Sequence, residues 1–336
     1  MEFGICFKGF VEADRARYLA RMAEVAGFRY CWFYDSHILW REPYPAMAML
    51  MEHTKEMRFG PLVTNPDLRD WSLAASLFGS LAKQSGNRFE FAVGRGDSSR
   101  RVMGNKPAPL ERVAEFVHKV KAMVRGEEVT YEGCPNPVKF PWADGYDMPA
   151  WIGAYGPLAL KCAGEHAEGV VLQIADPGLC QWFADQCKAA ARAAGRDAGK
   201  FRVMAAAPAY FRSMEEGIEA TKWFPAMVGN HVADIVEKYG KDTDLVPQSL
   251  TSYVEKRRGY DYSKHGQSDN PFLDFITPDV VKSFCVLGTP QEHVRKLNQL
   301  KEAGVTQFNI YLDNGDEENI IATYGREVIP AFAGRA

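Results

Sequence analysis

The sequence predicts an eight-stranded α/β barrel with insertions, a (β/α)8 fold. Short apolar segments, typical of buried strands, alternate with longer segments of helical periodicity along most of the 336 residues. Such alternation predicts a parallel sheet, and a set of eight strands favours a closed barrel over an open, doubly wound sheet. The predicted strands are residues 3–7, 29–33, 57–63, 88–93, 149–153, 169–174, 201–206 and 306–312. The predicted helices are residues 11–26, 71–84, 109–125, 157–165, 178–194, 289–303 and 316–329.

The ends of two predicted helices carry the residues expected there. Gly27 follows the first helix and Gly304 follows helix 289–303, at positions where a left-handed residue commonly ends a helix. Thr289 and Pro290 begin the latter helix as an N-cap and a first-turn proline. The same strand and helix unit is therefore expected at both ends of the chain.

Two segments interrupt the alternation. Residues 126–148 are rich in proline and glycine and predict a long loop, whereas residues 223–283 form a longer insertion with helical, polar and aromatic parts. Long irregular segments in compact domains are usually functional. We therefore expect one barrel domain over residues 1–336, with 126–148 and 223–283 as insertions and the second of these as a substrate lid.

The composition is that of an ordinary soluble protein. Hydrophobic residues make up 46% and charged residues 25% of the chain, and the formal net charge is -3. The basic residues are scattered, which argues against a nucleic-acid-binding surface. No leader pattern and no run of about 18 apolar residues occurs, so we expect a cytoplasmic protein with no membrane segment. The seven cysteines have no metal-binding spacing, so we expect them to be reduced and expect no metal.

The fourth predicted strand runs directly into a loop suited to ligand binding. Residues 89–93 are apolar and aromatic, and Gly94 and Gly96 then allow a sharp turn and a close approach of the backbone to a ligand. Arg95 and Asp97 supply charge. The loop lacks the third glycine of the dinucleotide-binding fingerprint, so it does not predict a Rossmann site.

Active sites of α/β barrels form at the carboxyl ends of the strands, so the residues after each strand are the candidates. A lone histidine such as His37 is nevertheless more often structural than catalytic, and a tryptophan such as Trp40 more often packs in the core. No HExxH motif and no GxSxG elbow is present, which argues against a metallohydrolase or an acyl-transfer enzyme. In strand order, the candidates are Lys8, Gly9, Glu12; Asp35, Ser36, His37, Trp40; Thr64, Asn65; Gly94–Ser99; Tyr155–Pro157; and Gln173, Asp176, Pro177.

At these positions the chain resembles the bacterial luciferase-like superfamily of flavin-type oxidoreductases, and within it the branch that uses the deazaflavin coenzyme F420. The resemblance spans essentially the whole chain, and its segments occur in the order typical of the family. These segments are Cys6–Glu12, Trp32–His37, Asn87-Arg88 leading to Gly94–Asp97, Trp151–Pro157, and Val286–Pro290 through Ala303–Val305.

The resemblance implies the same barrel with a flavin or deazaflavin, either F420 or FMN, bound in its mouth. The cofactor phosphate is expected against the loops after the fourth and fifth strands, and a non-prolyl cis peptide is expected at Leu62-Val63, behind the ring. The cofactor-binding residues that this implies are Asp35, Ser36, Leu62, Val63, Thr64, Gly94, Arg95, Gly96, Ser98, Tyr155, Gly156 and Pro157.

The resemblance also implies a catalytic set, with one departure. Deazaflavin-dependent sugar-phosphate dehydrogenases of the superfamily end the second strand with an Asp-His pair, followed by a Trp four residues after the His. Asp35 and Trp40 match this pattern, but Ser36 occupies the position of the His, and His37 is displaced by one residue. The sugar-phosphate reaction itself is therefore not expected. The predicted catalytic residues are His37, as the first candidate proton donor, Trp40, Glu12 and Asp97.

These observations predict an oxidoreductase that transfers a hydride between F420 and a small organic substrate. An FMN-dependent monooxygenase that uses reduced flavin and O2 is the alternative on the same fold, and a non-enzymatic barrel that has lost its cofactor is the alternative of another class. The glycines at 94, 96 and 156 favour a barrel that holds a cofactor. The expected partners are a second copy of the chain, in a homodimer, and a flavin or F420 reductase.

Overall fold

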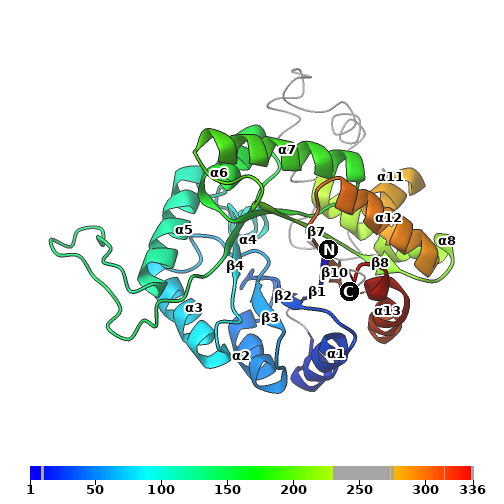
Figure 1. Cartoon of the computed structure of the whole chain (residues 1–336), viewed down its shortest axis with the longest axis horizontal. Coiled ribbons are helices and arrows are strands. Elements are labelled where there is room, and N and C mark those ends of the chain that lie inside the picture. Colours follow the sequence, from blue (N-terminus) through cyan, green and yellow to red (C-terminus); the bar gives the residue numbers. More distant parts are fainter. Residues whose placement is uncertain (9–10, 230–272, 274–275, 314, 334–336) are drawn as a thin grey trace.

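The computed structural model is a barrel of parallel strands ringed by helices, as predicted (Figure 1). It describes residues 1–8, 11–229, 273, 276–313 and 315–333. The sheet has eight strands in the order β3-β2-β1-β10-β7-β6-β5-β4, and each predicted strand overlaps one of them. β8 (Ala209–Tyr210) and β9 (Val286–Leu287) form a separate short parallel sheet. The barrel strands are β1 (Glu2–Phe7), β2 (Tyr30–Phe33), β3 (Arg58–Pro61), β4 (Phe91–Val93), β5 (Ala150–Gly153), β6 (Gly169–Leu172), β7 (Arg202–Ala207) and β10 (Gln307–Tyr311).

The barrel closes between β3 and β4 through a seam of separate bridges instead of a continuous ladder. The seam consists of the parallel bridges Phe59–Phe89 and Thr64–Val93. Between them, a Cβ atom on Gly60 would lie 2.1 Å from the carbonyl oxygen of Glu90. Because no side chain fits in that space, glycine allows the two strands to approach closely enough to close the barrel.

The helices surround the strands and cover their outer faces (Figure 1). All seven predicted helices are present, although the last one changes from α-helix to a π-helical turn at Tyr324–Val328. α2 was not predicted from hydrophobic periodicity, because its sequence, PYPAMAMLMEH, has apolar residues on most sides of the helix. α4 and α8 are short and were also not predicted, whereas most of α11 falls within the insertion 223–283, for which helical parts were expected without bounds. The helices are α1 (Ala13–Val25), α2 (Pro43–His53), α3 (Trp71–Ser85), α4 (Asp97–Val102), α5 (Leu110–Val124), α6 (Pro157–His166), α7 (Pro177–Ala193), α8 (Met214–Thr221), α11 (Pro278–Phe284), α12 (Pro290–Glu302) and α13 (Glu317–Thr323).

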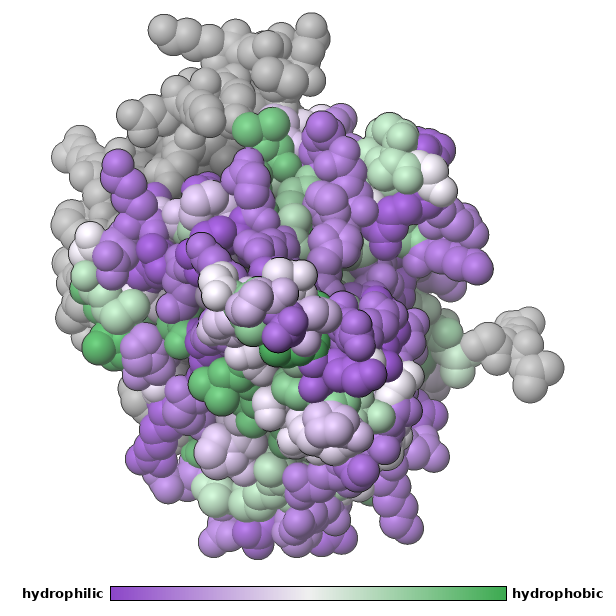
Figure 2. Space-filling model, turned by 90° about the vertical axis from the view of Figure 1, so that its left-hand side faces the viewer, coloured by the Kyte–Doolittle hydropathy of each residue, from purple (hydrophilic) through white to green (hydrophobic). Residues whose placement is uncertain are grey.

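The first of the two predicted insertions projects from the ring between α5 and β5, on the left of Figure 1. A single antiparallel bridge joins Val129 to Val138 within it. The Trp142 ring packs against α3, where a Cβ atom on Gly79 would lie 3.3 Å from it. Figure 2 looks onto this side of the molecule, with the projecting segment nearest the viewer. The lid predicted over 223–283 falls largely on residues 230–272, which lie outside the described residues.

A buried carboxylate fills the floor of the barrel, at the amino ends of the strands. Glu90 is 2% exposed and accepts hydrogen bonds from Arg58 Nε at 2.6 Å and from Trp151 Nε1 at 2.8 Å. The guanidinium of Arg202, across the barrel, is a third partner at 3.3 Å. This network joins β3, β5 and β7 to the residue that precedes β4, and therefore ties the closing strands to the opposite wall.

We expect Glu90→Gln to lower the free energy of unfolding by about 3 kcal/mol, because it leaves two guanidinium groups in the barrel floor without their counter-charge. Urea unfolding followed by circular dichroism measures the loss. Glu56→Gln is the matched control, since it removes the partner of Arg29 from an exposed pair and is expected to cost at most about 0.5 kcal/mol. Equal losses in the two variants would contradict the role of the floor network.

Candidate active site

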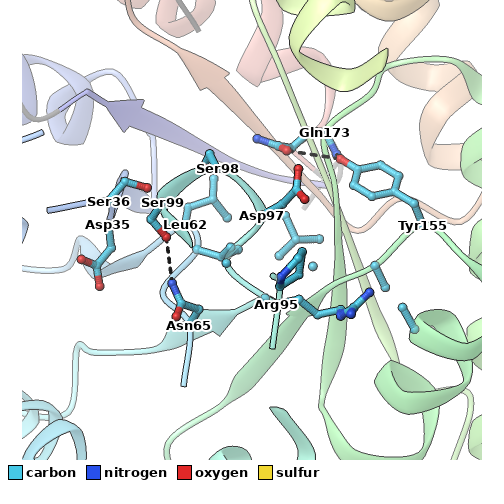
Figure 3. A pocket seen from close by; sticks show the side chains of 18 of the residues that line it. Asp35, Ser36, Leu62, Asn65, Arg95, Asp97, Ser98, Ser99, Tyr155 and Gln173 are labelled. Atoms are coloured by element: carbon cyan, nitrogen blue, oxygen red, sulfur yellow. Dashed lines mark hydrogen bonds between the residues drawn. The ribbon is translucent and has the colours of Figure 1, made fainter. Parts of the chain in front are cut away.

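A cavity of about 290 Å³ opens at the carboxyl ends of β2 to β6 (Figure 3). This is the end at which barrels of this kind build their active sites, and the volume is near the lower limit of small-molecule sites. Residues that follow five successive strands contribute to its wall. The wall consists of Tyr34, Asp35, Ser36, Trp40, Leu62, Val63, Asn65, Gly94–Ser99, Pro107, Leu110, Gly153–Gly156, Leu158, Ala159, Val171, Gln173 and Met227.

Most of the residues predicted for the site lie on this wall. They come from separate loops along the chain, so the barrel is what brings them together. The predicted residues on the wall are Trp40, Asp97, Asp35, Ser36, Leu62, Val63, Gly94, Arg95, Gly96, Ser98, Tyr155 and Gly156.

The glycine loop packs tightly against the loop that follows β3. A Cβ atom on Gly94 would lie 2.9 Å from Cγ2 of Val63, and one on Gly96 would lie 2.6 Å from Cγ of Asn65. Gly96 also has a φ of +77°, in the left-handed region that side chains disfavour. Both glycines are therefore required by contact between the two loops, and Gly96 by its backbone conformation as well.

A hydrogen bond fixes the same two loops to each other. Asn65 Nδ2 donates to Ser99 Oγ at 3.1 Å (Figure 3). Asn65 Oδ1 accepts a hydrogen bond from the backbone N–H of Asp67 at 3.1 Å. Both Asn65 and Ser99 are buried. The amide side chain thus holds the start of α4 against the β3 loop and sets the position of this part of the wall.

One part of the wall is apolar. The peptide bond between Leu62 and Val63 is cis, as the family resemblance implied, and both side chains line the cavity. Ala154 and Val171, from the ends of β5 and β6, also line it. Such a surface suits the flat face of an aromatic ring.

The charged side chains of the glycine loop are held by partners outside the cavity. Arg95 Nε donates to the carbonyl of Ala108 at 2.7 Å, and the amide of Ala108 donates back to the Arg95 carbonyl at 2.8 Å. Asp97 forms a salt bridge with Arg101, one helical turn further along α4. These contacts fix the shape of the loop, so its backbone N–H groups and serine hydroxyls are the groups best placed to meet an anionic group of a ligand.

A polar chain crosses the cavity wall from β5 to β10. The backbone N–H of Gln173 donates to the Tyr155 hydroxyl at 2.8 Å, and that hydroxyl donates to Gln173 Oε1 at 3.4 Å (Figure 3). Gln173 Nε2 in turn donates to the Tyr311 hydroxyl at 2.8 Å. Burial raises the pKa of both tyrosines, which keeps the phenols protonated as donors. Gln173 follows β6 and was among the candidates after the strands, although it was not in the predicted cofactor set.

Asp35 lines the cavity, but its carboxylate is engaged elsewhere. It accepts hydrogen bonds from the Tyr44 hydroxyl at 2.7 Å and from Arg69 at 2.9 Å. In Figure 3 the carboxylate points away from the labelled residues of the β5 and β6 loops. The geometry therefore fits a structural role, with Asp35 anchoring α2 and the β3 loop to the end of β2.

Four predicted site residues do not lie on the cavity wall. His37 is exposed because the carbonyl of Ser36 accepts the amides of Leu39 and Trp40 in a turn that directs His37 to solvent. Glu12 is also exposed and pairs with Arg41 at 2.9 Å. Thr64 and Pro157 are the remaining two. Thr64 is buried in the barrel seam, and Pro157 is the first residue of α6.

Several wall residues were not in the predicted set. Asn65 and Ser99 were visible as polar residues after β3 and β4, and their strand-end position was the available signal. Met227 and Leu110 had no such signal, because they come from helical segments whose approach to the mouth depends on tertiary packing. Among the described residues, no three His, Cys, Asp or Glu side chains are grouped to hold a metal ion. None of the helices in that same part of the chain has the length and apolarity to cross a bilayer.

Comparison with known proteins places this geometry in a family. The family model for luciferase-like monooxygenases matches residues 1–307. Similar proteins include 5,10-methylenetetrahydromethanopterin reductase of Archaeoglobus fulgidus, 28% identical over 98% of this chain and 99% of that protein. F420-dependent glucose-6-phosphate dehydrogenase of Microbacterium testaceum is 24% identical over 87% of this chain and 83% of its own. The solved structure of the coenzyme F420-dependent tetrahydromethanopterin reductase of Methanopyrus kandleri has a TM-score of 0.79 and 25% identity, covering 98% and 99% of the two chains.

We expect Gly96→Ala to destabilise the protein by about 3 kcal/mol, because the added methyl group overlaps Asn65 and strains a left-handed backbone. Gly104→Ala is the matched control: its φ of +76° is nearly the same, but nothing lies within 4 Å of the new Cβ atom. That control is expected to lose only about 1 kcal/mol. Urea midpoints give both values, and equal losses would show that packing against the β3 loop does not matter.

Proposed function

The chain belongs to the family of luciferase-like monooxygenases, and from this premise we propose that it is an oxidoreductase that uses coenzyme F420. The reaction is the transfer of a hydride between the deazaflavin and a small organic substrate. Relatives aligned over nearly the whole chain or most of it support the cofactor, since two of them are F420-dependent by name. The cavity at the carboxyl ends of the strands supports the location proposed for the bound cofactor.

The observation that carries the proposal is the composition of the cavity wall. Leu62 and Val63 offer an apolar surface for a flat ring, and the glycine loop and the Tyr155 loop offer polar groups at its edge. A tricyclic ring with a phosphate-bearing side chain needs both kinds of surface. The donors present therefore fit this class of cofactor.

Specific residues would hold the cofactor. Backbone N–H groups of Arg95–Ser99 and the hydroxyl of Ser98 would bind the phosphate, with Tyr155 and Gly156 on the opposite side, whereas the Gly94 N–H donates to the Thr64 carbonyl at 2.8 Å in the barrel seam. Gln173 would donate to or accept from the polar edge of the ring. When bound, the deazaflavin supplies the carbon that gives or takes the hydride.

The catalytic roles proposed for the chain concern orientation and proton transfer. Trp40 is on the cavity wall and would form one side of the space in which cofactor and substrate meet. Asp97 is on the same wall, while His37 and Glu12 lie outside it. Of these three predicted residues, Asp97 is therefore the best placed to exchange a proton with a bound substrate. We also expect a cytoplasmic homodimer, supplied with reduced cofactor by a separate reductase.

Anaerobic titration of the purified protein with F420 and with FMN tests the proposal. We expect F420 to bind at least about tenfold more tightly than FMN, read from quenching of deazaflavin or flavin fluorescence. Tight binding of FMN alone would instead favour the monooxygenase, and binding of neither would favour a barrel without a cofactor.

The glycine variants provide the matched control for this titration. Gly96→Ala displaces the loop that would bind the phosphate and is expected to weaken F420 binding by about tenfold or more. Gly104→Ala lies beyond α4, outside the cavity wall, and is expected to leave binding unchanged. Equal affinities in both variants would place the phosphate elsewhere.

A further inference from the structure

A charged pair lies in the half of the barrel mouth that the cofactor cavity does not occupy. Lys8 follows β1 and Asp313 follows β10, and these two strands are neighbours in the sheet. The Lys8 ammonium forms a salt bridge with the Asp313 carboxylate, and the two side chains are only 17% and 10% exposed. Because desolvation offsets the attraction within such pairs, their net contribution to stability is small. The pair lies at the carboxyl ends of the strands, where barrels of this kind bind their ligands, so its position indicates a role in ligand binding.

Two indole rings flank the ammonium group. Lys8 Nζ lies 4.4 Å from the centroid of the Trp223 ring and 6.0 Å from that of the Trp40 ring. Trp40 also lines the cofactor cavity, as does Met227, one turn after Trp223 on the same helical segment. The charged pair therefore adjoins the cavity, and Trp40 lies against both.

Aromatic contacts continue this connection to Asp313. The Tyr34 ring, on the cavity wall, packs edge-on against Trp40 at 5.7 Å and against Tyr311 at 5.4 Å. Tyr311 precedes Asp313 by two residues and accepts a hydrogen bond from Gln173. A molecule that extends from the cavity toward the charged pair would thus pass along aromatic side chains.

The charge of the pair decides which ligand group fits. Asp313 already neutralises Lys8, and burial raises the pKa of the Asp313 carboxyl while the Lys8 ammonium opposes that shift. A carboxylate or phosphate on the ligand would leave an uncompensated negative charge in a poorly hydrated site. An uncharged oxygen or nitrogen acceptor adds no charge and can accept a hydrogen bond from an ammonium group.

We propose that Lys8, Asp313, Trp40 and Trp223 form a substrate subsite that selects an uncharged ligand with a hydrogen-bond acceptor on an apolar or flat body. Asp313 sets this selectivity by neutralising Lys8. The inference rests on the proposed function in one respect, since it assigns the substrate end of the same active site.

Two probes of matched ring size test the selectivity: cyclohexanone, which is neutral, and cyclohexanecarboxylate, which is an anion. Saturation-transfer difference NMR on the full-length protein without cofactor measures their binding. We expect the wild type to bind the ketone about tenfold more tightly than the carboxylate, and Lys8→Met to lose about that factor for the ketone. Asp313→Asn removes this counter-charge of Lys8 and is expected to raise carboxylate affinity by about tenfold.

Lys83→Met is the matched control, because Lys83 forms an exposed ion pair with Asp144 away from the mouth; it is expected to change neither affinity. A wild type that prefers the carboxylate or binds neither probe overturns the proposal. So does a folded Asp313→Asn variant with no gain for the carboxylate. The comparison of probes on the wild type stands even where a variant fails to fold.

Titration of the same proteins with F420 separates this inference from the proposed function. Lys8 does not line the cofactor cavity, so Lys8→Met is expected to bind F420 as the wild type does. If the wild type did not bind F420 but still preferred the ketone, the proposed function would be contradicted and the subsite would stand. If the wild type bound F420 but showed no preference between the probes, only the proposed subsite would be contradicted.

Discussion

Closure of the barrel between β3 and β4 is the constraint on which the candidate active site depends. The two strands meet through isolated bridges, so the seam needs support from side chains at both ends. Glu90 and Arg58 provide it in the floor, and Asn65 and Ser99 provide it at the mouth. The loops that complete the barrel at the mouth are also the loops that line the cavity. The geometry of the site and the integrity of the fold therefore depend on the same contacts.

The mouth is organised by paired charges. Four carboxylates around it are each matched with a cation: Asp35 with Arg69, Asp67 with Arg100, Asp97 with Arg101 and Asp313 with Lys8. Such pairs cancel much of each other's field at a distance. An anionic cofactor group would therefore be recognised mainly by oriented backbone N–H groups and hydroxyls, which is the recognition that a glycine and serine loop provides.

The sequence allowed the strands to be predicted well because buried parallel strands are short, continuous apolar runs. α2 was missed since its apolar residues are not confined to one face, and α4 because a glycine-rich loop does not indicate a helix. The strand-end rule found most of the cavity wall. It failed at His37, where a turn after β2 decides the direction of the side chain. Whether a residue after a strand points inward depends on loop hydrogen bonds, which short-range sequence patterns do not specify.

The two halves of the mouth are joined by a continuous set of contacts. Tyr155 and Gln173 belong to the cavity on the β5 and β6 side, and Gln173 also donates to Tyr311 on β10. Tyr311 lies beside Tyr34 and two residues before Asp313. A shift of Gln173 toward a bound ring would alter its hydrogen bond to Tyr311, next to the charged pair. The side chain of Gln173 therefore contacts both halves of the mouth, through its Oε1 and the Tyr155 hydroxyl on one side and through its Nε2 and the Tyr311 hydroxyl on the other.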